Sequence, residues 1–346
     1  MKKILALALC LCMVICAVAC TTKEPEAKEA EYKLGLGVVV STASSKENNA
    51  QVDATIAAVV TDAEGKIVAC RIDVAQNKMD ITNGAVDTAK TFETKMELGD
   101  RYGMAGKVDN NGDGVMKEWY EQTKAFETYV TGKTVAEVEA IKTQEANGHQ
   151  IAVDEALLNA GCSMQITDFI QAVAKACKDE QGMSFKTAAT FTLGVAAKTA
   201  AADSKAATAE ADGLVAMYSD IAACVVADGK IIAALNDAIQ PKINVTVAGV
   251  PTAQEFKGTK RELKSGYGME GKVDNNGDGV MKEWFEQSKA FSEYAVGKTA
   301  ADIKGMQTTE ANGHQITVDQ ALLDAGCSIQ ITGICAVVAQ AAENAR

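Results

Sequence analysis

The sequence predicts an α+β protein made of two tandem copies of one small domain, each a mostly antiparallel sheet packed with helices. The first observation is an internal repeat: Tyr102 to Thr167 aligns without gaps to Tyr267 to Thr332, and about 47 of the 66 aligned positions are identical. Two further observations support this fold class. Runs of β-branched residues ahead of the repeated segment predict strands, and apolar residues at a helical spacing within it predict helices. A period of about 165 residues indicates duplication of a whole domain, so we place the copies at 32–180 and 184–346.

The sheet of each copy begins with short apolar runs. Gly35 to Val39 predicts an early strand, and the alternating runs Val52 to Val60 and Lys66 to Val74 predict a hairpin. The residues between these two runs, Asp62-Ala63-Glu64-Gly65, have the composition of a turn. The second copy matches this region more loosely, at Ile221-Ala222-Ala223 and Gly229-Lys230-Ile231.

Helices are expected in the second half of each copy. Lys117 to Val130 places apolar and aromatic residues at a helical spacing. Thr134 followed by Glu137 is a capping-box pattern that opens a short helix to Ile141. Two further helices, Val153 to Ala160 and Asp168 to Cys177, are expected around a turn at Gly161-Cys162-Ser163.

The N-terminus predicts export and a lipid anchor. A charged start is followed by an apolar run, Ile4 to Ala19, which is too short to span a bilayer stably. Ala17-Val18-Ala19-Cys20 resembles the lipobox of bacterial lipoproteins, so residues 1–20 are expected to be a signal with Cys20 as the diacylated N-terminus. Residues 21–31 are charged and lack aromatic residues, which favours a flexible tether on the extracellular face. An ordinary cleaved signal or an uncleaved anchor is the alternative.

Composition excludes several classes of protein. The net charge of -12 and the pI of about 4.8 argue against nucleic-acid partners, because no basic patch offsets phosphate repulsion. The absence of CxxC and His-rich spacings argues against zinc, haem or an iron–sulfur cluster. Of the cysteines beyond Cys20, only Cys162 and Cys327 match between the copies, so we expect mostly buried apolar thiols and not a disulfide framework.

The Gly-Cys-Ser turn is the candidate chemical site. A hydroxyl that holds a phosphoryl group is well placed at a glycine turn before a helix, where free backbone N–H groups favour the phosphate. Ser163 and Ser328 are expected at such positions, with Thr167 and Thr332 as alternative hydroxyls. A helix N-cap serine without any ligand is the alternative interpretation of the same motif.

Ala160-Gly161-Cys162-Ser163 and Ala325-Gly326-Cys327-Ser328, with Ala172-Val173 after the first, resemble the Ser-Gly-Ala-Thr motif and following helix of the FMN-binding domain family. In that family a transferase links the FMN phosphate to the threonine. The resemblance therefore implies one FMN in each copy, covalently held, with Ser163 and Ser328 replacing the threonine. It implies flavin-contacting positions at Gly161, Gly326, Cys162 and Cys327.

The mature chain further resembles the two-domain flavin-bearing lipoproteins of flavin-based extracellular electron transfer in Gram-positive bacteria. The resemblance runs through Gly35 to Val39, Glu97-Leu98, Tyr102-Gly103-Met104, Lys117 to Gln122 and Gly132-Lys133-Thr134. It implies an electron carrier at the cell membrane and not an enzyme with its own substrate. The implied partners are a membrane quinol-linked dehydrogenase or flavin-reducing subunit, a flavin transferase and external electron acceptors.

A second motif gives an alternative. Asp109-Asn110-Asn111-Gly112-Asp113-Gly114 and its copy place oxygen ligands at positions one, three and five of an EF-hand calcium loop, but position twelve is Tyr120 or Phe285 instead of a carboxylate. A polar turn is the simpler interpretation. The alternative function is a non-flavin extracellular ligand-binding or adhesion lipoprotein that binds calcium through Asp109, Asn111 and Asp113 and through Asp274, Asn276 and Asp278.

The two histidines, His149 and His314, occupy equivalent positions in Asn-Gly-His-Gln. One imidazole per copy is not a metal site by itself, and a solvated turn histidine is the simplest interpretation. The other interpretation places each histidine near the flavin ring or phosphate, because the Asn-Gly-His-Gln segment directly precedes the two helices around the Gly-Cys-Ser turn.

Overall fold

The computed structural model describes residues 29–346, so the expected signal and Cys20 lie outside the described residues. The described chain is mixed α/β, with ten α-helices and several small antiparallel sheets. One sheet has the strand order β3-β2-β1-β6 and a second has the order β10-β9-β7. These strands are β1 (Ala30–Ser41), β2 (Asn49–Asp62), β3 (Ile67–Asp80), β6 (Met183–Thr187), β7 (Thr192–Ala200), β9 (Tyr218–Ala227) and β10 (Lys230–Ile239).

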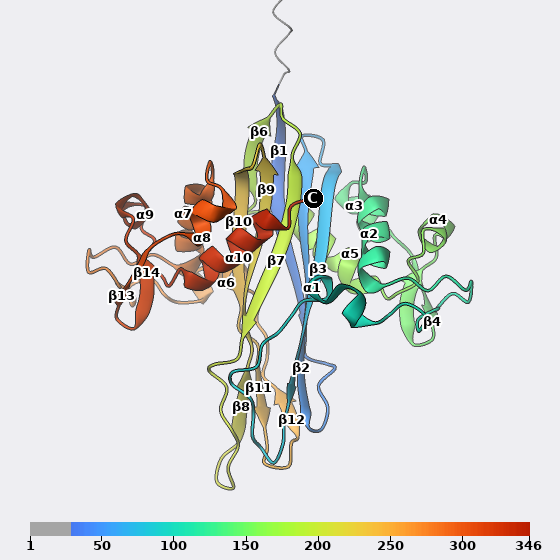
Figure 1. Ribbon diagram of the computed structural model, residues 1–346, viewed down its shortest axis with the longest axis horizontal. Helices are drawn as coiled ribbons and strands as arrows, with labels where there is room; N and C mark the ends of the chain where they lie inside the picture. Colours follow the sequence, from blue (N-terminus) through green and yellow to red (C-terminus); the bar gives the residue numbers. More distant parts are fainter. Residues whose placement is uncertain (1–28) are drawn as a thin grey trace, which may run out of the picture.

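The two sheets pack face to face (Figure 1). The first holds three strands of the first repeat and β6 from the start of the second, and the other is made by the second repeat. Leu34, Ile56 and Val60 of the first repeat pack in one cluster with Leu193, Ile221 and others of the second. Strand β2 is buried on both faces, because Ile56 points into this shared core while Ala57 and Val59 belong to the helix-covered side. The two copies therefore share a hydrophobic core and do not form two separate globules.

Helices cover the outer face of each sheet, which gives four layers in the order helix, sheet, sheet, helix (Figure 1). In the first repeat α2 (Trp119–Val130) and α5 (Thr167–Cys177) bury Trp119, Phe126 and Phe169 against β2 and β3. In the second repeat α7 (Trp284–Ala295) and α10 (Thr332–Glu343) do the same against β9 and β10.

Glycines let α5 and α10 cross their sheets at close range. A Cβ atom on Gly35 would lie 1.9 Å from the carbonyl oxygen of Ala176, and one on Gly194 would lie 2.0 Å from that of Ala341. Any side chain at these two positions would push the helix away from the strand. The early glycine-containing strand predicted from the sequence is therefore the floor on which α5 lies.

The strands and helices expected from the sequence pattern form, with shifted ends. The hairpin β2–β3 turns at 62–66 with Gly65 at φ +75°, and Thr134 caps α3 (Val135–Glu139) through a complete capping box with Glu137. The helix expected from Val153 to Ala160 is shorter, α4 (Glu155–Asn159). The expected tether was too long by two residues, since Ala30 and Glu31 already pair with β6.

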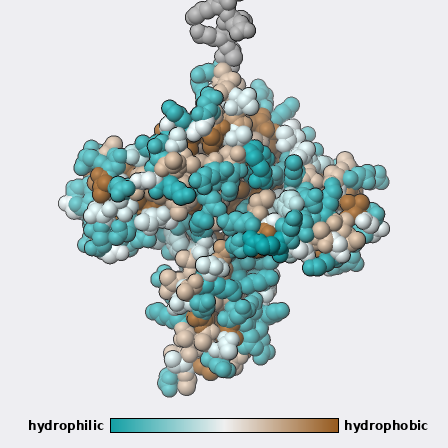
Figure 2. Space-filling model, viewed as in Figure 1, coloured by the Kyte–Doolittle hydropathy of each residue, from teal (hydrophilic) through white to brown (hydrophobic). Residues whose placement is uncertain are grey.

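Several shorter elements complete the described chain, and most lie in the two flanking lobes and the narrow lower end of the molecule (Figures 1 and 2). The lower end holds the sheet β12-β11-β8, whose Val215, Ile243 and Val245 pack with Val52 and Met79 of the first repeat. These elements are α1 (Lys95–Leu98), η1 (Gly99–Tyr102), β4 (Thr143–Ala146), β5 (His149–Ala152), β8 (Gly213–Ala216), β11 (Lys242–Val245), β12 (Pro251–Ala253), α6 (Lys260–Leu263), η2 (Lys264–Gly266), α8 (Ala300–Lys304), β13 (Thr308–Ala311), β14 (His314–Thr317) and α9 (Gln320–Asp324).

Within residues 29–346, no helix combines the length and the apolar character needed to cross a membrane.

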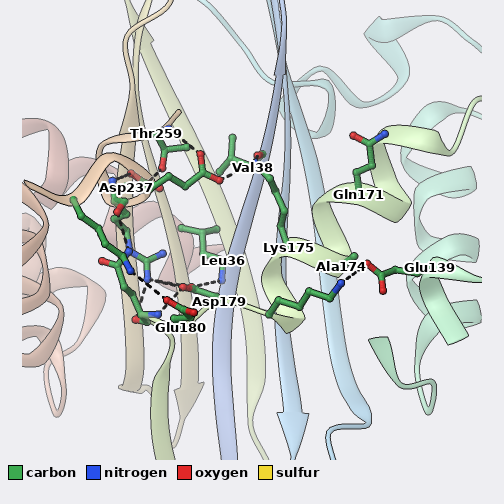
Figure 3. Close-up of a pocket in the computed structure, with 15 residues that line it drawn as sticks. Leu36, Val38, Glu139, Gln171, Ala174, Lys175, Asp179, Glu180, Asp237 and Thr259 are labelled. Atoms are coloured by element: carbon green, nitrogen blue, oxygen red, sulfur yellow. Dashed lines mark hydrogen bonds and ion pairs between the residues drawn. The ribbon is translucent and has the colours of Figure 1, made fainter. Parts of the chain in front are cut away.

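A buried ion pair ties the two repeats together beside a cavity of about 540 Å³ (Figure 3). Arg261 of α6 donates to Asp179, which follows α5, over 3.0 Å, and the two side chains are only 7% and 9% exposed. Asp179 also accepts from the backbone N–H of Leu36, and Arg261 donates to the carbonyl oxygen of Gln181. Because these bonds satisfy both charged groups in a buried place, they fix the angle between the repeats.

A buried carboxylate in each repeat should make stability depend on pH. Burial raises the pKa of Asp73 from 3.8 to about 6, although its carboxylate accepts from the backbone N–H groups of Val74 and Met96. Since the pKa of Asp73 is higher in the folded protein than in the unfolded chain, the folded state binds the proton more tightly. The stabilisation that comes from protonated Asp73 is therefore lost as pH rises from about 4 to about 6.

We therefore expect Asp73→Asn to flatten the dependence of the urea midpoint on pH over that window and to keep or raise stability at pH 7, because an amide retains the acceptor oxygen without a buried charge. Glu64→Gln, at an exposed turn position, is the matched control and should leave the pH profile unchanged. A steeper profile in the Asp73→Asn protein would contradict this assignment.

Candidate functional site

The Gly-Cys-Ser turn of each repeat lies in the loop between a short helix, α4 or α9, and the sheet-covering helix that follows it, α5 or α10. Ser163 follows α4 and is 2% exposed, and Ser328 follows α9 and is also 2% exposed. Both hydroxyl oxygens are buried, and within residues 29–346 neither has a hydrogen-bond partner. An unsatisfied buried hydroxyl is costly and uncommon, and here the same one recurs in both copies.

Two side chains from the preceding segment hold the serine backbone. The buried Gln122 of α2 accepts from the N–H groups of Ser163 and Met164 over 3.0 and 3.1 Å, and Asn110 donates to the carbonyl oxygen of Ser163 over 2.8 Å. In the second repeat Gln287 and Asn275 make the corresponding bonds to Ser328. These bonds hold the backbone of the loop in place, and they leave the serine hydroxyl without a hydrogen bond to the described residues.

The glycine of the motif makes room for a lysine. Gly161 has φ +86°, and a Cβ atom there would lie 2.7 Å from the Lys117 side chain, whose amine donates to the carbonyl oxygen of Ala160 over 2.8 Å. Gly326 and Lys282 repeat this arrangement. In each serine loop a lysine side chain therefore lies against the glycine, in the space that a Cβ atom would fill.

One expectation for this turn was wrong: the N–H group of Ser163 is bonded to Gln122 and is not free for a phosphate. The turn does precede a helix, since α5 begins at Thr167, but the loop folds inward against α2 and buries Ser163. The N-cap alternative is equally absent at this position, since the residue before α5 is Ile166 and makes no side-chain cap.

A cavity of about 500 Å³, a size typical of ligand pockets, is lined by residues next to the Ser328 loop, although Ser328 itself is not in its wall. Ile329 and Gln330, next in the chain, form part of its wall, and Asn275, which binds the serine loop, forms another part. The remaining wall has an aromatic and basic part, from Tyr218, Lys260, Tyr267, Trp284 and His314, and a second part from Ala200, Ala202, Asp203, Gln240, Met269 and Gly313. Flat aromatic walls with one buried cation suit a planar anionic ligand.

Lys260 is the central charge of this cavity. Its amine lies 4.9, 4.8 and 5.1 Å from the ring centres of Tyr218, Tyr267 and Trp284, and the residue is only 7% exposed. Burial lowers its pKa to about 8, against the opposing effect of Asp220 and Asp237, so it stays mostly protonated at neutral pH. Burial also raises the pKa of Asp220 to about 6 and raises that of Tyr218.

The first repeat has most of the same groups at equivalent positions. The amine of Lys95 lies 4.8 Å from the Tyr102 ring centre and 5.5 Å from that of Trp119. Lys95 is half-buried, whereas Lys260 is buried. Both repeats thus combine a lysine over aromatic rings with a buried, uncommitted serine hydroxyl.

The structure separates the other predicted site residues by exposure. Cys162 and Cys327 are fully buried, and burial raises the pKa of each thiol to about 12, so neither is a reactive thiolate. Among the six cysteines of the described chain all are free and only Cys177 is not classed as buried, which confirms that most are small buried apolar residues.

Thr167 is half-buried and Thr332 is exposed, and each lies at the start of its helix. His149 and His314 are exposed on the hairpins β4–β5 and β13–β14, and only His314 is in the wall of the cavity described above.

The calcium-like loops are closed by their own carboxylates. Asp109 accepts from the N–H groups of Gly112, Asp113 and Gly114, and Asn111 donates to Asp113. In the second loop Asp274 accepts from the N–H groups of Gly277 and Gly279, and Asn276 donates to Asp278. Glu118, a further carboxylate of the segment, instead accepts from Met104 and Ala105. In residues 29–346 no group of three or more His, Cys, Asp or Glu residues is arranged to hold a metal ion.

We expect calcium removal to leave stability unchanged, because these backbone bonds satisfy the carboxylates without an ion. Thermal melting with EDTA, compared with melting in excess calcium, checks this, with magnesium as the control for ionic strength. A melting temperature that rises with calcium but not with magnesium would restore the calcium loop.

Sequence reasoning missed Gln122, Asn110, Lys117 and Lys95 and their partners in the second copy. On a helix pattern Gln122 reads as a polar surface residue, yet it is fully buried. The available signal was identity between the copies: all four have the same residue in the second repeat, at Gln287, Asn275, Lys282 and Lys260. Polar residues that survive divergence of a duplicated domain are candidates for a shared site.

The fold and these two sites define a duplicated α/β protein with one buried serine loop in each half. No family model and no solved structure matches the chain. It is similar to a protein named chlorophenol reductase from Desulfitobacterium hafniense, with 33% identity over 175 residues that span 45% of this chain and 51% of that protein. The chain thus spans about half the length of this curated relative.

Proposed function

We propose that this protein is a membrane-anchored extracellular flavoprotein that carries electrons, with one FMN in each repeat linked through Ser163 and Ser328. The observation that carries the proposal is the pair of buried serine hydroxyls that have no hydrogen-bond partner within residues 29–346, in repeats that each also hold a lysine over aromatic rings. A phosphate ester on each hydroxyl would remove the unsatisfied group in both copies at once.

The residues present fit an FMN group. Ser328 would supply the oxygen for the ester, Lys282 would supply positive charge at the serine loop, and Lys260 would supply it in the wall of the cavity. Trp284 and Tyr267 supply flat apolar walls that exclude water from a planar ring. When bound, the flavin supplies reversible electron and proton uptake, and the protein supplies its position and surroundings.

The two candidate sites are on opposite flanks of the sandwich (Figure 1). The hairpin β4–β5 lies in one lobe and β13–β14 in the other, with both sheets between them. This arrangement favours separate encounters of each flavin with its partners. We propose a membrane dehydrogenase or flavin-reducing subunit as donor, external acceptors as the electron sink, a flavin transferase that loads the serines, and attachment to the membrane by lipid on Cys20.

The visible spectrum tests this function. The chain made together with a flavin transferase should be yellow and keep its flavin absorbance after denaturation and gel filtration, and reduction followed by air should cycle the colour. The chain made without the transferase is the control and should be colourless. A colourless, correctly folded product in both cases would reject the flavoprotein proposal and favour the non-flavin ligand-binding alternative.

A further inference from the structure

A second cavity of about 500 Å³ in the second repeat has two sulfur atoms at its wall. It is lined by residues of α10, which include Cys335, and by Met306, which follows α8. The Sγ atom of Cys335 lies 3.8 Å from the Sδ atom of Met306. Cys335 is 8% exposed and Met306 is half-buried, so the two sulfur atoms lie where the core meets the cavity. This cavity shares no lining residue with the one next to the Ser328 loop.

The sulfur pair belongs to the second repeat alone. The equivalent positions in the first repeat are Ile141 and Ile170, which pack against the core of that repeat. Two contacting positions thus differ together between the copies, from an apolar pair to a thiol and a thioether. Packing alone does not require this exchange, because two isoleucines fill the same positions in the first copy.

The two side chains have the chemistry of a soft-metal site. A thiolate and a thioether are the protein ligands that select Cu(I) and similar soft cations. With metal–sulfur bonds of about 2.3 Å, sulfur atoms 3.8 Å apart subtend an angle of about 110° at an ion between them. This angle suits a three- or four-coordinate ion and leaves room for a further ligand from the cavity.

The charges around the cavity favour a monovalent ion. Lys304 in the wall pairs with Glu343 over 3.7 Å. Lys198, the other cation of the wall, pairs with Glu97 over 3.8 Å. Because these charges are already balanced, a Cys335 thiolate with a monovalent cation adds no net charge to the wall. The cavity does not offer the set of three or more His, Cys, Asp or Glu ligands that a divalent ion would use, a set that residues 29–346 do not form anywhere.

We propose that Cys335 and Met306 form a binding site for a soft monovalent cation of the Cu(I) and Ag(I) class. When the ion binds, the S–H bond of Cys335 breaks, a metal–sulfur bond forms and the proton passes to solvent, while Met306 donates a lone pair and no electron is transferred. Burial raises the pKa of the Cys335 thiol to about 12, so at neutral pH only a metal with a high affinity for sulfur displaces this proton. The site is separate from the serine loops and does not depend on flavin.

Competition for Cu(I) tests the site. The full chain, reduced and kept under nitrogen, is added to the coloured complex of Cu(I) with bicinchoninate, and the loss of colour counts the copper that the chain takes. Because other thiols also bind Cu(I), the result is the difference between variants. Cys335→Ile should take one equivalent less than the unchanged chain, and Met306→Ile should keep that equivalent but bind it at least about tenfold more weakly.

The first repeat supplies the controls. Isoleucine is its residue at both positions, so both variants are expected to fold, and circular dichroism checks this. Cys335→Ala gives the same test should isoleucine not fit. Cys177→Ala removes a partly exposed thiol where the second repeat has Ala342, and adding Cys335→Ile to it should still remove one equivalent. Equal copper uptake with and without the Cys335 thiol, or unchanged affinity in folded Met306→Ile, would overturn the proposal and leave the two sulfur atoms as core packing.

Discussion

Ser163→Ala and Ser328→Ala are each expected to remove about half of the bound flavin, and the double variant is expected to remove all of it. Each repeat has one buried hydroxyl that the protein leaves without a partner, and alanine deletes the ester oxygen. The ratio of flavin absorbance to protein absorbance, measured after denaturation so that only covalently held flavin counts, reports the loss.

The fold should survive these substitutions. An unsatisfied buried hydroxyl opposes folding, so replacing it with a methyl group is expected to keep or slightly raise the melting temperature of the flavin-free protein. Thr167→Ala and Thr332→Ala, which remove the hydroxyls at the helix starts, are the matched controls and should keep full loading. Full loading in both serine variants, with loss in the threonine variants, would move the attachment to the helix starts.

Arg261→Ala is expected to lower the free energy of unfolding by about 3–5 kcal/mol, because it leaves the carboxylate of Asp179 buried and unpaired. The pair is almost completely shielded from water and links α6 of the second repeat to the residues after α5 of the first. Urea denaturation followed by circular dichroism measures the loss.

Arg101→Ala is the matched control for this prediction. Arg101 pairs with Glu93 at a distance of 2.6 Å, but the two side chains are 62% and 47% exposed, so its loss should lower the free energy of unfolding far less than the loss of Arg261 does. Equal effects of the two substitutions would show that the cross-repeat pair adds no more than a surface pair does.

Local signals in the sequence were sufficient for many elements of each repeat. Turn residues at 62–65 locate the β2–β3 hairpin, and the Thr134 and Glu137 pair locates the start of α3, because both depend on neighbouring residues alone. The face-to-face packing of the sheets was not predicted. It depends on Ile56 and Ile221, about 165 residues apart, meeting in one core.

The candidate site was located by sequence, but its environment was not. The serine motif was found because it recurs beside a glycine, whereas its burial depends on Gln122 turning inward from α2 to bind the loop. Short apolar strands such as β8 and β11 were missed because three or four residues carry too little periodicity. The fit of Gly333 against the Asp220 carboxylate could not be predicted either, because it depends on how α10 lies on β9.

Mass spectrometry of the protein purified from its native membrane tests the central claim most directly. We expect the peptides containing Cys162-Ser163 and Cys327-Ser328 each to carry the added mass of FMN, with fragmentation assigning it to the serine. Both peptides at their unmodified amino-acid masses, in protein from which denaturation releases no coloured group, would contradict the electron-carrier account.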